Sequence, residues 1–267
     1  TRTESELVYL KKSFENMLIE ADTRGGHATG FAMIDSEGDY ILCKKNKNAN
    51  GFLHSKSTQA SLDCLYDDVS LIMGHTRYAT KGSPSINKNN HPIRAGHTIG
   101  THNGSVSNDN ELFRKFNMER HAQVDSEVVF RLFDESISEN DFVDNRLKLI
   151  QGRVALVWSD LERPEYVYMV KANNPLELAY IPTLNIIAYG STNQIIQAGF
   201  KANIQPIEVK KNTMLRINTK TLKIRRTDIK ISEPKYSFSF NNKLGIDTDS
   251  HYKNTVSRFV PRFSHRD

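Results

Sequence analysis

The feature that most constrains the fold of this chain is a series of short apolar segments after Gly152. Four candidate strands follow one another, with only short turn-like connections between them, at residues 154–158, 166–171, 176–181 and 186–189. Connections of this kind join antiparallel neighbours, because a parallel crossover needs a dozen or more residues. This part of the chain is therefore predicted to form antiparallel sheet.

A strong helix signal lies near the start of the sequence. Thr3 and Glu6 have the spacing of a capping box, in which each residue hydrogen-bonds the backbone of the other. Apolar residues then recur every three or four positions, at Leu7, Leu10, Phe14, Met17, Leu18 and Ala21. A helix is predicted from this cap to about Asp22. Only two residues precede the cap, so no strand fits between Thr1 and the helix.

The remaining elements also occur in blocks. Strands are predicted at residues 29–34, 40–44, 69–73, 97–101, 207–209, 213–217 and 222–229, and helices at 109–116, 125–136, 141–150 and 193–198. Blocks of strands and helices joined by hairpins are typical of an α+β fold with antiparallel sheets. Residues 1–231 are predicted to form one domain. Residues 232–267 are interpreted as a basic C-terminal tail or docking arm, with one strand candidate at 236–240.

Composition limits the class of protein. Hydrophobic residues make up 38% of the 267 residues and charged residues 25%, which is enough to bury a core. No apolar run approaches the roughly 18 to 20 residues that span a bilayer, and the polar start does not resemble a secretory signal. Two cysteines cannot build a disulfide framework. A cytoplasmic protein without membrane contact is expected.

The basic residues are concentrated towards the C-terminus. The formal net charge is +5, and from Phe200 onward Lys and Arg outnumber Asp and Glu by more than two to one. Such a surface can face water, an acidic partner or nucleic acid. Aromatic residues do not alternate with the basic ones as they do in a stacking platform. A solvated surface is therefore favoured over nucleic-acid binding.

Three polar segments carry candidate chemistry, at residues 74–82, 102–108 and 124–127. An Arg at a strand end, here Arg77, can bind a carboxylate with a bidentate fork. Asn103 followed by Gly104 can supply a side-chain amide and a backbone N–H to an oxyanion. Asp125, also a candidate N-cap of the following helix, can bind an ammonium group. Taken singly these motifs are usually structural, but together they fit a free amino acid.

The residues and the order of these segments resemble the motifs of the class II, N-terminal-nucleophile glutamine amidotransferases. The likeness is to the glutaminase domains of glucosamine-6-phosphate synthase and glutamine phosphoribosylpyrophosphate amidotransferase, over about residues 5–200. The motifs that carry it are Arg24-Gly25-Gly26-His27-Ala28-Thr29-Gly30, Gly74 to Gly82, Asn89-Asn90-His91-Pro92, His102 to Asn108 and Asp125-Ser126-Glu127. Lys81 stands where glucosamine-6-phosphate synthase has a histidine, which is one departure from the pattern.

The resemblance implies a fold, an activity and a set of roles. The fold would be a four-layer α/β/β/α sandwich, and the reaction would hydrolyse L-glutamine to glutamate and ammonia, without a cofactor, for an acceptor on a partner protein. Arg77 would bind the α-carboxylate with help from Thr80, and Asp125 would bind the α-ammonium. Asn103 and Gly104 would form the oxyanion hole. Supporting roles fall to Gly25, Gly26, His75 and His102.

The nucleophile of this family is an N-terminal cysteine, on a strand that precedes the first helix, whose own α-amino group is the general base. Here the sequence starts at that helix. One interpretation places roughly 8 to 15 further residues, with the cysteine, upstream of Thr1. The other is a catalytically inactive relative that acts as a binding or scaffold protein. The full set of glutamine-holding residues favours the first. A hydrolase of the same fold acting on another amide is a third option, disfavoured by Arg77 with Asp125.

Residues that could replace the missing cysteine or hold a metal are better explained structurally. The helix cap at Thr3 leaves no strand to carry Thr1 into a sheet. Cys43 and Cys64 lie in apolar surroundings and are predicted to be core thiols. The four histidines at positions 75, 91, 97 and 102 lack the spacing of a metal site. No metal is therefore expected.

Overall fold

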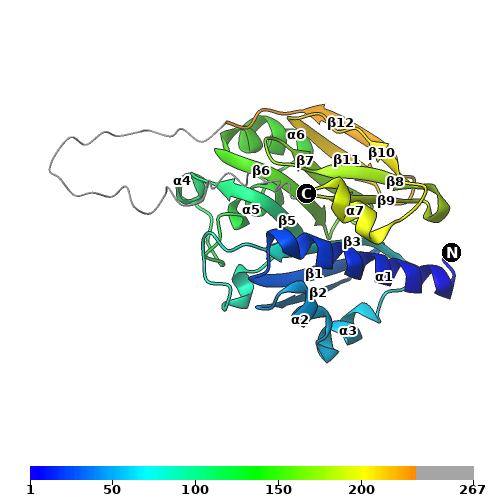
Figure 1. Ribbon diagram of the computed structural model, residues 1–267. Helices are drawn as coiled ribbons and strands as arrows, with labels where there is room; N and C mark the ends of the chain where they lie inside the picture. The colour runs from blue at the N-terminus through cyan, green and yellow to red at the C-terminus, as the bar shows by residue number, and fades with distance from the viewer. Residues whose placement is uncertain (233–267) are drawn as a thin grey trace, which may run out of the picture. The chain divides into compact units, whose positions relative to one another are not determined.

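The computed structural model describes residues 1–232, beginning with the predicted N-terminal helix (Figure 1). Glu6 N–H donates to Thr3 Oγ1 at 3.3 Å, and Thr3 N–H donates to Glu6 Oε2 at 2.7 Å. This reciprocal pair is the capping box, which satisfies two of the backbone donors that a helix start leaves free. The predicted start of the helix is confirmed.

The elements follow the predicted order closely. The helices are α1 (Glu4–Ala21), α2 (Ala49–Leu53), α3 (Lys56–Leu62), α4 (Asp109–Lys115), α5 (Glu127–Asp134), α6 (Glu139–Asp141) and α7 (Asn193–Gly199). The strands are β1 (Ala28–Asp35), β2 (Tyr40–Lys45), β3 (Val69–Arg77), β4 (Ile93–Ala95), β5 (Thr98–Val106), β6 (Gly152–Asp160), β7 (Tyr166–Lys171), β8 (Glu177–Ile181), β9 (Ile186–Gly190), β10 (Gln205–Ile207), β11 (Thr213–Asn218) and β12 (Ile224–Asp228).

All strand pairs between these elements are antiparallel. One sheet has the order β2-β1-β3, a second β10-β8-β9, and a six-stranded sheet β12-β11-β7-β6-β5-β4. The predicted α+β class with antiparallel sheets is confirmed. Register is fixed where alternate residues are buried, because a shift by one residue would turn the apolar side chains outward.

The packing clusters place these sheets in layers. Apolar residues of β1, β3, β8 and β10 meet those of β5, β6, β7 and β11 in a core between the sheets, which includes Ala32, Met73, Val157 and Leu178. On the outer side of the first two sheets, α1 packs against both: Leu18 lies with β1, and Leu10 and Met17 with β8 and β9. The outer face of the six-stranded sheet is covered by α4 and α5. These are the four layers of the predicted sandwich.

Two strands are longer than predicted. The β3 strand continues through Gly74 to Arg77, because Gly74 pairs with Phe31 and its missing side chain makes room for Phe14 and Leu18 of α1. The β5 strand continues through His102, Asn103 and Gly104 to Val106, paired with β6 throughout. The predicted strand at 97–101 was therefore too short, since the motif residues from His102 to Val106 are part of the sheet.

Several local predictions need correction. The segment 141–150 is not a regular helix but a π-helical turn, Phe142–Arg146, followed by a short 3₁₀ turn, Leu147–Leu149. The short elements α2, α3 and β4 were not predicted. Cys64 is exposed rather than a core thiol, and Cys43 is partly buried beside β1. Apart from Ser232, the predicted C-terminal arm lies outside the described residues, and its boundary remains a prediction.

Candidate active site

A cavity of about 490 Å³ runs between β3 and β9. It is lined by most residues of β3 and by every residue of β9. Successive side chains of a strand point to opposite faces of the sheet. Residues from both faces of β3 and β9 can therefore line one cavity only where the cavity runs along the edges of these strands. Within residues 1–232, β3 pairs only with β1 and β9 pairs only with β8. We call this space the β3–β9 cavity.

The two ends of the β3–β9 cavity are distinct. At one end, Arg2 hydrogen-bonds Asp67, just before β3, and Arg2 Nη1 donates to the Leu184 carbonyl, just before β9, at 2.8 Å. At the other end, Arg24 Nη1 donates to Ser191 Oγ, just after β9, at 3.0 Å. The strands β3 and β9 therefore run in the same direction, away from Arg2. The lining includes His75, Thr76 and Asn103, and the predicted site residues Arg77 and Gly104 are the next residues along β3 and β5.

Arg77 is the last residue of β3 and is 4% exposed. Its Nη1 donates to Asn90 Oδ1 at 3.0 Å, and its Nη2 donates to the carbonyls of Lys81 and Gly82 at 2.6 and 2.8 Å. Burial lowers the pKa of the Arg77 guanidinium, and the nearby Asp125 carboxylate opposes that shift. A guanidinium has five N–H donors, so donors remain for a carboxylate.

Asp125 lies just before α5 and does not cap it, which corrects the predicted N-cap. The helix begins after Ser126, which makes no side-chain cap bond, whereas Asp125 Oδ2 accepts a hydrogen bond from Val106 N–H of β5 at 2.6 Å. The carboxylate is buried, with 7% of the residue exposed. Because one oxygen is held by the backbone, the other is left to accept from a ligand cation close to Arg77.

The Asn103–Gly104 segment presents two kinds of donor. Side chains of β5 alternate, so that Ile99, Thr101 and Asn103 face the core between the sheets, while His102 faces α5. The Asn103 side chain therefore points towards the β3–β9 cavity. Its own carbonyl accepts from Asn174 Nδ2 at 2.7 Å, which fixes the backbone there.

The Gly104 N–H points away from β6. Val154 is the β6 residue opposite Gly104. Its N–H donates to Asn173 Oδ1 and its carbonyl accepts from Ala172 N–H, so neither group bonds Gly104. The N–H groups of Gly104 and Val106 therefore emerge from the same edge of β5, and no described strand covers that edge beyond Gly100. Gly104 has a φ of +145°, and an added Cβ would lie 1.8 Å from the Arg153 carbonyl oxygen. Only glycine fits this backbone.

Three histidines lie behind these groups: His91 and His102 are buried, and His75 is half-buried. His102 Nε2 is 3.1 Å from the Arg153 carbonyl and Nδ1 is 2.9 Å from Ser126 Oγ, which suits a neutral ring that donates from Nε2. The rings of His75 and His91 are 4.4 Å apart. Burial lowers the pKa of His75 to about 4 and also lowers those of His91 and His102. The supporting role of His75 and His102 stays a prediction.

The other predicted residues are less closely involved. Gly25 packs against the backbone of Thr76, where a Cβ would come within 2.6 Å of its carbonyl carbon, and Gly26 has a φ of +99°. Both shape the turn beside the end of the β3–β9 cavity. Thr80 is exposed, and no hydrogen bond of its side chain is found among residues 1–232. Cys43 hydrogen-bonds Thr58, and neither it nor Cys64 lines the β3–β9 cavity.

Sequence reasoning missed the residues that hold the loop after β3. Asn90 accepts from Arg77 and donates from Nδ2 to the Pro84 carbonyl at 2.8 Å. Asn89 Nδ2 donates to the Ser83 carbonyl and to Gln123 Oε1. Both asparagines are almost fully buried. Their place in a quoted motif was a signal, but their partners depend on the fold.

Within 1–232, no group of three or more His, Cys, Asp or Glu side chains is arranged to hold a metal ion. No helix in that range is long and apolar enough to cross a membrane.

Curated relatives resemble this chain at low identity. Glutamine–fructose-6-phosphate aminotransferase of Bacillus licheniformis is 24% identical over 218 residues, which cover 79% of this chain and 34% of that protein. The 7-cyano-7-deazaguanine synthase 2 of Sulfurisphaera tokodaii is 24% identical over 230 residues, covering 84% and 48%. No family model matches the chain.

Solved structures agree on the fold. Glutamine phosphoribosylpyrophosphate amidotransferase of B. subtilis superposes with a TM-score of 0.64 at 18% identity, over 83% of this chain and 46% of that one. A structure titled as the allosteric regulatory enzyme of purine biosynthesis gives a TM-score of 0.65 at 16% identity. The predicted resemblance to class II glutamine amidotransferases is confirmed. The fold is the α+β sandwich of the N-terminal-nucleophile amidotransferases.

The amidotransferase likeness does not extend over whole proteins. The chain spans between about a third and a half of the length of the curated relatives named above, and less than half of the superposed B. subtilis chain. The relatives therefore support an amidotransferase domain, and the remainder of each relative has no counterpart in the alignment.

Proposed function

We propose that this domain is a glutaminase that hydrolyses the side-chain amide of L-glutamine to glutamate and ammonia. The observation that carries the proposal is the grouping of Arg77, Asp125 and Gly104. Arg77 and Gly104 directly follow Thr76 and Asn103, which line the end of the β3–β9 cavity. Asp125 accepts from Val106 of β5 and is close enough to Arg77 to oppose the lowering of its pKa. An arginine and an aspartate side by side match the α-carboxylate and α-ammonium of a free amino acid. A backbone N–H on an uncovered strand edge, with the Asn103 amide nearby, suits the oxyanion that forms at the side-chain carbonyl.

We further propose that a strand from a segment preceding Thr1 fills the β3–β9 cavity and joins β3 to β9. Two open strand edges on either side of an elongated cavity are a strong reason for such a strand, because their backbone groups would otherwise lack partners. The bonds of Arg2 to Asp67 and to the Leu184 carbonyl support placing the end of this strand at the starts of β3 and β9. The strand would run antiparallel to both and would begin beside His75, Thr76 and Asn103.

The length of β3 sets the length of the proposed strand. β3 has nine residues, so a matching strand of up to nine residues would extend roughly 30 Å. This agrees with the expected 8 to 15 residues upstream of Thr1. Its first residue, a cysteine, would lie at the site, where its α-amino group is the only base the reaction needs.

The chemistry then follows in two steps. The cysteine thiol passes its proton to the α-amine, and its sulfur attacks the amide carbon of glutamine to give an oxyanion held by Gly104 and Asn103. The C–N bond breaks as the amine returns the proton, which releases ammonia and leaves a thioester. Water adds to the thioester, the C–S bond breaks, and glutamate leaves. We propose that an acceptor on a partner protein consumes the ammonia in the cytoplasm.

Glutamate release by the protein with its preceding segment tests this proposal. Arg77→Ala removes the carboxylate fork and should raise the glutamine KM by roughly 10- to 100-fold, since charge-assisted bonds contribute about 1.5–3 kcal/mol. Arg77→Lys, which keeps the charge but not the fork, should fall between. Arg114→Ala is the control, because Arg114 is exposed on α4 and its side chain donates to the Asn110 carbonyl, away from the site.

The outcomes separate the two candidate functions. Glutamate release that depends on Arg77 supports the glutaminase. Glutamine binding without glutamate release, in a protein whose preceding segment lacks cysteine, supports the alternative of an inactive binding or scaffold protein. Release that is the same in Arg77→Ala and the wild type contradicts the assigned site.

A further inference from the structure

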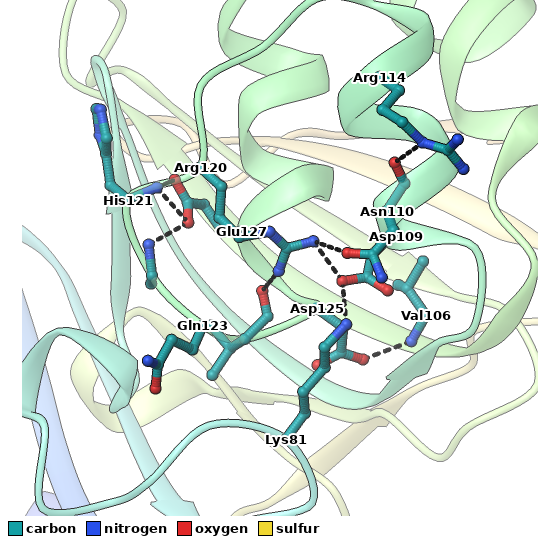
Figure 2. A network of polar contacts seen from close by, with 12 residues as sticks. Lys81, Val106, Asp109, Asn110, Arg114, Arg120, His121, Gln123, Asp125 and Glu127 are labelled. Carbon is teal, nitrogen blue, oxygen red and sulfur yellow. Dashed lines mark hydrogen bonds and ion pairs between the residues drawn. The ribbon is translucent and has the colours of Figure 1, made fainter.

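A buried carboxylate joins the two sides of the candidate site. Asp109, in the first turn of α4, has a side chain only 4% exposed. Its Oδ2 accepts hydrogen bonds from Lys81 Nζ and from Arg120 Nη2, both at 2.5 Å. Figure 2 shows the Asp109 carboxylate between these two cations, with Asp125 and Val106 close by. We call the three residues the Asp109 bridge.

The Lys81 arm of the bridge reaches the arginine of the site. Lys81 belongs to the loop after β3, and its carbonyl, with that of Gly82, accepts from Arg77 Nη2 at 2.6 and 2.8 Å. The side chain of Lys81 is thus fixed at Asp109 while its backbone holds the Arg77 guanidinium. Gly82 makes this turn with a φ of +77°. A displacement of Lys81 would move two of the three acceptors that orient Arg77.

The Arg120 arm reaches the aspartate of the site. Arg120 Nη1 donates to the carbonyl of Val124 at 3.1 Å. Val124 is the residue immediately before Asp125. Its guanidinium carbon also lies 4.2 Å from the centre of the Phe113 ring, which fixes its orientation. The two arms therefore connect the groups proposed for the α-carboxylate and the α-ammonium through one oxygen atom.

The charges favour this arrangement. Burial alone would raise the pKa of the Asp109 carboxyl, but the hydrogen bonds from Lys81 and Arg120 outweigh it and hold that pKa below its ordinary value. An ionised carboxylate with two cations is stable in such a site, whereas an unpaired one would be costly. When Lys81 is removed, Arg120 still pairs with Asp109, so the fold should survive.

We propose that Lys81 and Asp109 are positioning residues that set the separation of Arg77 and Asp125 for recognition of a free α-amino acid. The inference rests on the proposed function, because it concerns the same glutamine site. It also explains the departure noted at position 81, where a lysine follows Thr80. A lysine is long enough to reach the Asp109 carboxylate and charged enough to hold it.

Two measurements on the protein with its preceding segment test the bridge. The first is hydrogen exchange of residues 78–83 without glutamine, which should become at least fivefold faster in Lys81→Met. The second is steady-state glutamate release, where Lys81→Met should raise the glutamine KM about tenfold and change kcat less than twofold. Lys81→Arg should restore both values, because it keeps a cation within reach of Asp109.

The control is Lys88→Ala, because Lys88 is exposed, follows the same loop and has no part in the bridge. Lys81→Met with unchanged exchange and unchanged KM overturns the inference. So does an equal loss in Lys88→Ala. If the wild-type protein releases no glutamate, the proposed function fails, while faster exchange in Lys81→Met alone would still establish the bridge as a restraint on the loop.

Discussion

The backbone at Gly104 offers a test that separates a structural from a functional role. Replacing Gly104 with Ala places a Cβ 1.8 Å from the Arg153 carbonyl oxygen, at a φ of +145°. The obstacle is backbone within the β5–β6 pair, so it cannot rotate away as a side chain could. An unfavourable φ and a steric conflict each cost about 1–3 kcal/mol, so a loss of roughly 2–6 kcal/mol of unfolding free energy is expected.

Gly38 provides a matched control for this substitution. It has a φ of +88°, and a Cβ there would lie 2.1 Å from the Leu161 carbonyl oxygen. Gly38 is in the hairpin between β1 and β2 and does not line the β3–β9 cavity. Gly38→Ala should therefore cost a similar free energy, and both variants should melt roughly 4–24 °C below the wild type.

Only Gly104→Ala should affect the reaction beyond its effect on stability. Moving the Gly104 N–H removes a donor to the oxyanion, and such losses lower kcat by about 10²–10³. Thermal unfolding by circular dichroism and glutamate release well below the melting temperatures provide the comparison. A Gly104→Ala protein as stable as the wild type would refute the backbone argument. Equal kcat values in the two alanine variants would refute the oxyanion role.

Two further predictions concern stability. The His75 imidazole is neutral in the folded protein with a pKa of about 4, while the unfolded chain takes up that proton near the ordinary value of 6.5. The unfolding free energy should therefore fall as pH drops from about 6.5 to 4, by about 3 kcal/mol for this group. Urea midpoints that do not change between pH 7 and pH 5 would contradict it. Thr3→Ala removes the side-chain half of the capping box and should cost about 1 kcal/mol, seen as a lower urea midpoint. No change would mean that the cap contributes nothing to global stability.

The fold was largely predictable because its signals are local. The capping box at Thr3, the apolar stripe behind it and the hairpins after Gly152 depend on residues close together in sequence. The end of β3 was predicted too early, because glycine is usually unfavourable within a strand, whereas here pairing with β1 continues through Gly74. Gly74 suggested the end of β3, yet it is needed there because α1 packs tightly on the strand.

The candidate site was predictable only in part. Arg77, Asn103, Gly104 and Asp125 were proposed from the order of the motifs, but the contacts that hold them in place were not predicted. Asp125 accepts from Val106 rather than capping α5, and Lys81 meets Asp109 across 28 positions of sequence. Partners so far apart in sequence are specified by the register of β5 and the placement of α4, which no local pattern contains.

The central claim is that a cysteine on a strand in the β3–β9 cavity attacks glutamine. The most direct measurement is peptide mass spectrometry after treating the protein, with its preceding segment, with a glutamine-like diazoketone. The account predicts one adduct, on a cysteine upstream of Thr1, that excess glutamine prevents and Arg77→Ala reduces. No adduct on such a cysteine, or labelling of Cys43 or Cys64 alone irrespective of glutamine, would contradict it.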